Sequence, residues 1–273
     1  MNTEKTADEK YEGLKEYLAG LGSVAVAFSG GVDSTFLITA AHEALADNAV
    51  AITAHDAAMP ASELEEALSF CRERGIRHYI IETDPLTLPE YRYNQSDRCY
   101  HCKRYIFGKI ADEAAGHGIS NIAEGSNMDD LGDYRPGMKA IEELHVLSPL
   151  REAGLYKSEI RELSEKKGLP GWDKPAAACL ATRFAYGDTI TKEGLHMVEL
   201  AEAFLKENGF GHCRVRVHGD LARIEVWPSE IARIAEDEMR RRVCSRLRSI
   251  GFAYITIDMQ GYRTGSMNEV LEQ

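Results

Sequence analysis

A short apolar run that leads straight into a glycine-rich turn is the feature that most constrains how this chain can fold. The run from Val24 to Phe28 continues into Ser29-Gly30-Gly31-Val32-Asp33-Ser34, and the residues from Asp33 to Asn48 have a helical pattern. Such a run is typical of a strand buried on both faces of a parallel sheet. Adjacent glycines let the backbone turn with positive φ and approach a bound anion closely. A strand, a tight turn and a helix N-terminus are therefore expected in direct succession.

Strands and helices alternate along the rest of the first two thirds of the chain. Buried-strand patterns recur at residues 49–54, 78–82, 121–124 and 145–147, and helical patterns at 62–75, 99–116 and 158–167. This alternation implies right-handed crossovers and a parallel sheet covered by helices on both faces. The prediction is an α/β, Rossmann-like domain over residues 1–188 with a parallel five-stranded sheet.

A different pattern begins at about residue 189. A helix at residues 192–208 precedes strands at 214–217 and 222–227, a helix at 229–250 and a final strand at 253–258. This order predicts a separate small α+β domain over residues 189–273. Its last helix carries five arginines behind acidic residues 236–238, which favours a solvated or subunit-facing helix over a nucleic-acid surface.

Composition restricts the partners and the location of the protein. The 273 residues include 32 Lys and Arg against 44 Asp and Glu, so the net charge is 32 − 44 = −12. Such a field repels polyanions, so a nucleic-acid substrate is not expected. The sequence has no apolar stretch of about 18 residues, the length of a membrane span, and no apolar signal region at its N-terminus. We therefore expect a cytoplasmic protein.

The glycine-rich turn has the chemistry of a phosphate site. A helix N-terminus offers unpaired N–H groups and the positive end of a dipole, and Ser29 and Ser34 add hydroxyl donors beside Gly30 and Gly31. Asp33 would repel a bare phosphate, but a Mg²⁺ ion bridging carboxylate and phosphate removes that objection. The Walker A pattern is absent, because no Gly-Lys is followed by Ser or Thr. A turn without a ligand is the simpler alternative, which the strand-turn-helix context disfavours.

Polar residues after the fourth predicted strand are candidates for the same site. Asn127 and Asp130 follow that strand, and ligands of open parallel sheets bind beyond the carboxyl ends of the strands. We therefore expect both residues to help hold a nucleotide or its metal ion.

Three of the six cysteines suggest a metal or sulfur centre. Cys99 and Cys102 form a C-x-x-C pair at a helix start, so both lie on one helix face, and Cys179 lies in a predicted loop. Zinc would need a fourth ligand, for which His101 is the obvious candidate. An unliganded pair is a second interpretation. A [4Fe–4S] cluster on three cysteines leaves one iron open, and the ligand count favours this third interpretation.

Basic residues in the predicted C-terminal domain form a second candidate site. Arg214 and Arg216 alternate with valines, so they share one strand face. Glu225 on the adjoining strand could orient an arginine through paired hydrogen bonds, and Arg263 lies in a glycine-flanked turn after the last strand. Taken by themselves, these residues would be read as ordinary surface salt bridges.

The segment Ser29-Gly30-Gly31-Val32-Asp33-Ser34 resembles the SGGxDS signature of the PP-loop ATP pyrophosphatases. That superfamily includes GMP synthetase, NAD synthetase, asparagine synthetase and several tRNA thiolation enzymes. The resemblance implies cleavage of ATP between its α- and β-phosphates, which leaves AMP on the substrate and releases pyrophosphate.

Nearly the whole chain resembles one PP-loop family, LarE, the pyridinium-3,5-biscarboxylic acid mononucleotide sulfurtransferases. The resemblance is carried by the signature above and by residues 98–103, 125–130, 148–150, 179–183 and 261–266. It implies that a substrate carboxylate is adenylylated and converted to a thiocarboxylate. This is a step in making the nickel-pincer nucleotide, the cofactor of lactate racemase. By the same analogy we expect a homo-oligomer.

The resemblance also implies roles for single residues. Cys179 matches a cysteine that in some members gives up its sulfur and is left as dehydroalanine. Other members have two further cysteines and are similar to cluster-dependent tRNA thiolases, and Cys99 and Cys102 place this chain with them. A sulfide on the open iron would then be the nucleophile, with Cys179 as a ligand. A last group, Arg214, Glu225 and Arg263, matches a cluster that binds the mononucleotide phosphate.

Two other functions stay open at this point. A PP-loop tRNA thiolase would use the same three cysteines, although the net charge of −12 argues against an RNA substrate. A nucleotide-binding scaffold with structural zinc and no catalysis would also fit the C-x-x-C pair.

Overall fold

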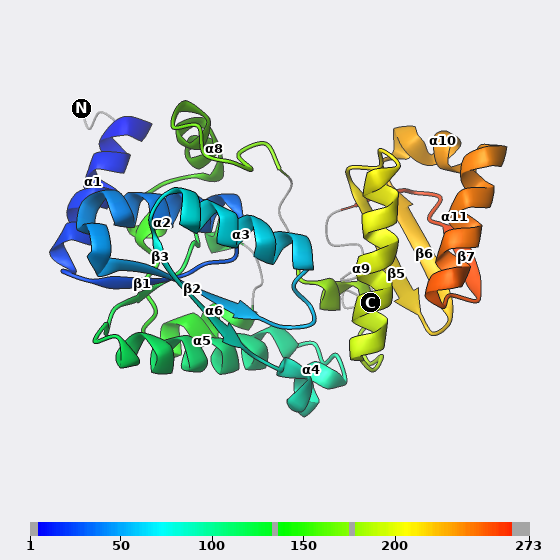
Figure 1. The fold of residues 1–273 in the computed structure, drawn as a ribbon, viewed down its shortest axis with the longest axis horizontal. Helices are drawn as coiled ribbons and strands as arrows, with labels where there is room; N and C mark the ends of the chain where they lie inside the picture. The colour runs from blue at the N-terminus through cyan, green and yellow to red at the C-terminus, as the bar shows by residue number, and fades with distance from the viewer. Residues whose placement is uncertain (1–4, 133–135, 175–177, 264–273) are drawn as a thin grey trace. The chain divides into compact units, whose positions relative to one another are not determined.

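The computed structural model describes residues 5–132, 136–174 and 178–263, which form two compact units (Figure 1). The first unit comprises Met1–Pro85 and Cys99–Ala177, and the second comprises Leu86–Arg98 and Ala178–Gln273. No sequence pattern indicated that the short segment Leu86–Arg98 belongs with the C-terminal part of the chain. Backbone hydrogen bonds explain it: the N–H of Gly187 donates to the Asn94 carbonyl and that of Ile190 to the Arg92 carbonyl.

The first unit contains the predicted parallel sheet, with four strands rather than five. The strands are β1 (Val24–Ala27), β2 (Ala49–His55), β3 (Arg77–Glu82) and β4 (Ile122–Ala123), in the order β3-β2-β1-β4. The predicted fifth strand at 145–147 is reduced to a single parallel bridge between Leu147 and Ala123. It cannot extend, because His145 has a φ of 53° and Pro149 already begins a helix.

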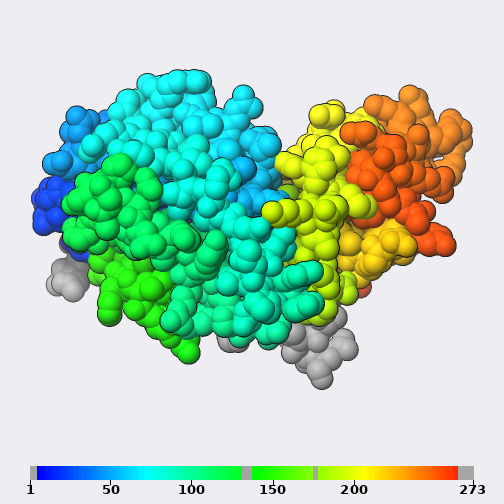
Figure 2. Space-filling model, turned by 60° about the horizontal axis from the view of Figure 1, so that its bottom comes forward, coloured from blue at the N-terminus to red at the C-terminus, as the bar shows by residue number. Residues whose placement is uncertain are grey.

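Helices cover both faces of this sheet, as predicted (Figure 1). Val24 and Val26 pack in one apolar cluster with Phe36 of α2, whereas Ala25 packs in a second cluster with Ile110 of α5. Alternate strand residues therefore face opposite helical layers, as the period of two requires. The first layer consists of α1 (Ala7–Gly20), α2 (Val32–Leu45), α3 (Ala61–Glu73) and α8 (Lys157–Lys166). The second consists of α5 (Arg98–Gly116) and α6 (Pro136–Glu143), and Figure 2 is turned to bring this layer forward.

The second unit is built on a small mixed sheet. Strands β5 (Cys213–His218) and β6 (Leu221–Val226) are antiparallel, and β7 (Tyr254–Ile257) lies parallel to β6. Helix α9 (Lys192–Glu207) begins at an N-cap, Thr191, whose side chain accepts the Gly194 N–H. The single helix predicted at 229–250 is instead α10 (Ile231–Ala235) and α11 (Asp237–Ile250), because Glu236 between them has a non-helical backbone with a ψ of 144°.

Short elements complete the described chain. They are α4 (Pro89–Arg92), α7 (Pro149–Glu152) and the 3-10 turns Ala46–Asn48, Pro85–Thr87, Met128–Gly132, Leu180–Arg183 and Pro228–Glu230. Among the described helices, none combines the length and apolar character that crossing a bilayer demands.

Candidate functional site

The glycine-rich turn adopts the geometry of an anion-binding loop. Strand β1 ends at Ala27 and α2 begins at Val32, with Gly31 as its N-cap. Gly30 has a φ of 74°, which strains any residue with a side chain. The Ser29 and Ser34 hydroxyls lie 3.2 Å apart, and Ser34 donates to the Gly31 carbonyl at 3.0 Å. These bonds fix the turn, and the first N–H groups of α2 have no partner within the helix.

Asp33, in the first turn of α2, is held by residues from two distant segments. The Lys157 ammonium donates to one of its carboxylate oxygens, and the Asn127 amide donates to the other at 3.2 Å. The Asp130 carboxylate accepts the backbone N–H of Asn127 at 2.9 Å. Of the two residues predicted after the fourth strand, Asn127 therefore meets the turn directly and Asp130 positions it.

A close approach of two backbones brings these segments together. A Cβ at Gly125 would lie 3.1 Å from both the Asp33 Cβ and the Ser34 nitrogen, so glycine is the residue that fits there without displacing α2. The preceding residue, Glu124, is buried and accepts hydrogen bonds from Ser126 at 2.8 Å and Ser148 at 2.6 Å. These two hydroxyls anchor the loop that carries Asn127.

Lys157 is a site residue that the sequence analysis missed. It is the first residue of α8, where its backbone N–H donates to Asp129 at 2.7 Å. A lysine in the first helical turn is unfavourable, because the N-terminal end of a helix dipole is positive. A lysine at this position could have indicated a site residue from the sequence alone, since a nearby anion offsets its unfavourable interaction with the helix dipole. Its side chain is 27% exposed and that of Asp33 is 25% exposed, so a ligand can reach the pair.

The three candidate cysteines are divided between the two units. Cys99 is exposed and Cys102 is half-buried, and both lie near the start of α5 in the first unit. Cys179 is exposed in the second unit, at the N-cap of the 3-10 turn Leu180–Arg183. Within the described residues, no three His, Cys, Asp or Glu side chains are grouped so that they could hold a metal ion.

A buried ion pair anchors the segment that carries Cys179. Arg183 donates to the carbonyls of Ala178 and Cys179 at 2.9 and 3.2 Å, and its other nitrogens donate to both Glu202 oxygens at 2.8 and 2.9 Å. Burial opposes the charge of both partners. Their mutual pairing nonetheless raises the pKa of Arg183 and lowers the pKa of Glu202. The backbone around Cys179 is therefore tied to the core of the second unit.

The arginines of β5 and β6 have different partners. Glu225 is fully buried and accepts hydrogen bonds from Arg216 at 3.0 and 2.8 Å, with Arg223 at 3.3 Å. Arg263 lies 3.3 Å from Asp258. Arg214, although cross-strand from Glu225, donates to the Cys213 carbonyl at 2.8 Å instead.

Arg214 is the member of this group with unused binding capacity. It is only 9% exposed, and among the described residues it makes no ion pair. Burial, together with the nearby charge of Arg183, lowers its pKa. A buried guanidinium without a carboxylate partner is stabilised by a bound anion. The structure thus separates Arg214, which can take a ligand, from Glu225, which positions neighbouring arginines.

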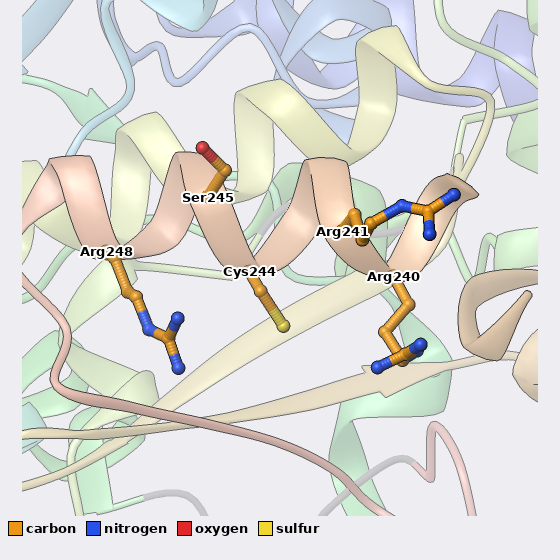
Figure 3. A pocket seen from close by; sticks show the side chains of 5 residues that line it. All are labelled: Arg240, Arg241, Cys244, Ser245 and Arg248. Atoms are coloured by element: carbon orange, nitrogen blue, oxygen red, sulfur yellow. The ribbon is translucent and has the colours of Figure 1, made fainter. Parts of the chain in front are cut away.

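A separate hollow of about 450 Å³ lies on α11, lined by Arg240, Arg241, Cys244, Ser245 and Arg248. Figure 3 shows Arg240, Cys244 and Arg248 extending to the same side of this helix. Val243 and Leu247 of the same helix are buried. None of the candidate site residues lines this hollow.

The parallel sheet, the glycine-rich turn and the residues gathered around Asp33 define an α/β protein of the PP-loop type. No family model matches the chain. It is 39% identical over 264 residues to an uncharacterised protein of Synechocystis, covering 97% of this chain and 98% of that protein. It is 36% identical over 255 residues to the pyridinium-3,5-bisthiocarboxylic acid mononucleotide synthase of Lactiplantibacillus plantarum, covering 93% and 92%. The chain therefore belongs to the LarE family, that of the pyridinium-3,5-bisthiocarboxylic acid mononucleotide synthases.

A shorter similarity connects the chain with a tRNA-modifying enzyme. A tRNA-specific 2-thiouridylase of Syntrophus aciditrophicus is 27% identical over 161 residues, which cover 48% of this chain and 43% of that protein. The LarE match extends over nearly twice as much of the chain. The expected resemblance to LarE is thus confirmed, and the similarity to the thiouridylase is partial.

Proposed function

We propose that this protein is an ATP-dependent sulfurtransferase. It adenylylates a carboxylate of pyridinium-3,5-biscarboxylic acid mononucleotide and converts it to a thiocarboxylate, within the synthesis of the nickel-pincer nucleotide. The observation that carries the proposal is the convergence of Asp33, Asn127 and Lys157 on the glycine-rich turn of a chain in this family. The relative from Lactiplantibacillus plantarum is named for a thiocarboxylate product, which supports the sulfur chemistry.

The ATP site is proposed at the N-terminus of α2. The backbone of Gly30 and Gly31 and the Ser29 and Ser34 hydroxyls would surround the β- and γ-phosphates, where the helix dipole favours negative charge. Asp33 has the carboxylate chemistry that Mg²⁺ prefers, and the ion would neutralise part of the phosphate charge. We propose that Lys157 leaves Asp33 when the nucleotide arrives and donates to a phosphate oxygen instead. Asn127 would stay on Asp33 and keep it oriented.

The proposed reaction has two steps. A carboxylate oxygen of the substrate attacks the α-phosphorus of ATP, the bond from that phosphorus to the bridging oxygen breaks, and pyrophosphate leaves. A sulfur nucleophile then attacks the acyl carbon and expels AMP, so that a carbon–sulfur bond replaces a carbon–oxygen bond. The positive end of the α2 dipole, the Mg²⁺ ion and Lys157 would together stabilise the negative charge that develops on the leaving pyrophosphate.

We propose Cys179, Cys99 and Cys102 as the residues of the sulfur step, and a [4Fe–4S] cluster as the group they hold. Two observations from the sequence support the cluster: the count of three cysteines and the LarE resemblance. The geometry of the described residues adds no support, since they contain no group of three metal-binding side chains. Iron and sulfide analysis of anaerobically purified protein tests the cluster, with about four irons per chain expected. One zinc and no iron would instead favour the scaffold hypothesis. Conversion of Cys179 to dehydroalanine during one turnover, seen by mass spectrometry, would show that this cysteine is sacrificed.

We propose that the mononucleotide phosphate binds Arg214, with Glu225 and Arg263 in supporting roles. Arg214 makes no ion pair within the part of the chain that the structure describes, whereas Glu225 holds Arg216 and Arg223 in place. The assembly is proposed to be a cytoplasmic homo-oligomer, by analogy with the family, and light scattering of the purified protein measures its mass.

Release of pyrophosphate tests the proposed reaction directly. Protein, Mg²⁺-ATP and the pyridinium dicarboxylate mononucleotide should release pyrophosphate and form AMP, and omission of the mononucleotide should stop both. An Asp33→Asn variant should lose this activity, while a Glu12→Gln variant on the exposed side of α1 serves as the matched control. If the wild-type protein releases no pyrophosphate, the proposed function is wrong. Binding of tRNA in a low-salt gel shift, with thiolation of that tRNA, would favour the thiolase instead.

A further inference from the structure

Three aromatic side chains gather at one end of the second sheet. His212 precedes β5, Trp227 follows β6, and Tyr262 lies just beyond β7. Because β5 and β6 are antiparallel with Cys213 opposite Val226, the first two residues lie at the same sheet end. The ring centroids are 4.8 Å apart for His212 and Trp227, and 5.2 Å apart for Trp227 and Tyr262. We call these three residues the aromatic trio.

The turn before Tyr262 is built to hold that ring in place. Gly261 has a φ of 73°, and a Cβ there would lie 2.7 Å from the Val226 carbonyl oxygen. The Tyr262 N–H donates to the same carbonyl at 2.7 Å. Tyr262 is therefore fastened to the end of β6, whereas Trp227 remains 39% exposed. A ligand can reach the trio without disturbing the sheet.

Arg214 lies directly beside the trio. Its guanidinium carbon is 5.4 Å from the centre of the Tyr262 ring, and it has no carboxylate partner among the described residues. A flat, electron-rich surface next to an unpaired buried guanidinium is complementary to a ligand with a flat cationic ring and a separate anionic group. A pyridinium mononucleotide has both, because its positive ring and its phosphate are attached to opposite ends of one ribose.

We propose that the aromatic trio is the binding site for the pyridinium ring of the substrate, next to the Arg214 that binds its phosphate. This inference rests on the proposed function, which supplies the pyridinium mononucleotide. It adds that the site selects the positive charge of the ring through cation–π attraction to Trp227 and Tyr262. The trio acts by recognition and positioning, since nothing in it is required to form or break a bond.

Three small-molecule probes distinguish binding of the pyridinium ring from binding of the phosphate. Nicotinamide mononucleotide has a cationic pyridinium ring, its reduced dihydro form has the same outline without the charge, and ribose 5-phosphate has no ring. Calorimetry should show the cationic form binding about tenfold more tightly than the reduced form, as a partly desolvated cation–π contact predicts. Equal affinities for the two forms would overturn the proposal.

Three variants test which residues give the preference for the cationic ring. Trp227→Leu should lose most of the preference for the cationic form, leaving only the contribution of Tyr262, while keeping the affinity for ribose 5-phosphate, and Arg214→Ala should weaken the binding of all three probes. Tyr254→Leu is the matched control, because Tyr254 is an aromatic residue at the opposite end of the same sheet and is 68% exposed. A Trp227→Leu variant that keeps the tenfold preference would overturn the proposal.

A second measurement does not depend on removing Trp227. The chain has two tryptophans, so a Trp172→Phe variant leaves Trp227 as its single tryptophan reporter. Nicotinamide mononucleotide should quench its fluorescence, and ribose 5-phosphate should not; absence of quenching would count against the trio. The proposed reaction is judged separately by pyrophosphate release. A protein that discriminates the probes but releases no pyrophosphate would keep the ring site and refute the reaction.

Discussion

Removal of the Glu202 charge should destabilise the second unit strongly, because Glu202 and Arg183 form a buried ion pair. Their side chains are 4% and 3% exposed, so solvent screens the pair little. In Glu202→Gln the Arg183 guanidinium stays buried without its counter-charge, and breaking such a pair costs about 3–5 kcal/mol. For a domain of this size, that loss lowers the unfolding midpoint by on the order of 10 °C.

The choice of substitution follows from a second hydrogen bond. Glu202 also accepts the Val215 N–H at 3.0 Å, and glutamine keeps that acceptor. Removing the acceptor as well would leave a buried N–H unsatisfied and add about 1–3 kcal/mol of unrelated cost. The double variant Arg183→Met/Glu202→Gln contains neither charge. It should therefore be more stable than the sum of the two single effects predicts.

Scanning calorimetry of the wild type, both single variants and the double variant measures this coupling. Glu162→Gln is the control, because Glu162 and its partner Lys166 are both on the surface of α8, and its unfolding midpoint should not change. The stability that the ion pair confers should also depend on pH. The pKa of Glu202 in the folded protein is lowered from 4.5, so its stabilisation is present above that value and is lost as the pH falls through the folded-state pKa. The double variant should lack this acid-side loss. Additive single effects, or a loss below about 1 kcal/mol for Glu202→Gln, would refute the role of the pair.

Three further predictions concern the proposed reaction. Lys157→Met should raise the KM for Mg²⁺-ATP by at least about tenfold, since a charged hydrogen bond contributes about 1.5–3 kcal/mol; unchanged ATP kinetics would exclude Lys157 from the phosphate site. Gly125→Ala should impair pyrophosphate release in a folded protein, because its Cβ would lie 3.1 Å from Asp33, whereas Gly108→Ala, with open space around it, should not. Cys179→Ala should abolish thiocarboxylate formation but leave ATP binding intact, whereas Cys244→Ala should remain active; product formation is followed by mass spectrometry.

Local patterns were sufficient to predict the core of the fold. The apolar run of β1, the two glycines and the helical period of α2 are neighbours in sequence, so their succession follows from short-range propensities and periodicity. The helix and strands expected between residues 192 and 227 were likewise predicted from local patterns. The LarE resemblance rests instead on matched motifs along the chain. The predicted fifth strand failed because periodicity does not report the positive φ of His145.

Contacts between distant segments were decided by the tertiary structure. Lys157 meets Asp33 only because α8 and α2 pack in the same layer over the sheet. The LarE resemblance placed Arg214 and Glu225 in one cluster, but the register and side-chain directions of β5 and β6 pair Glu225 with Arg216. Among the described residues Arg214 has no carboxylate partner. Propensity acts over a few residues, whereas the partner of a charge depends on how whole elements pack, and that arrangement is set by the burial of the apolar faces.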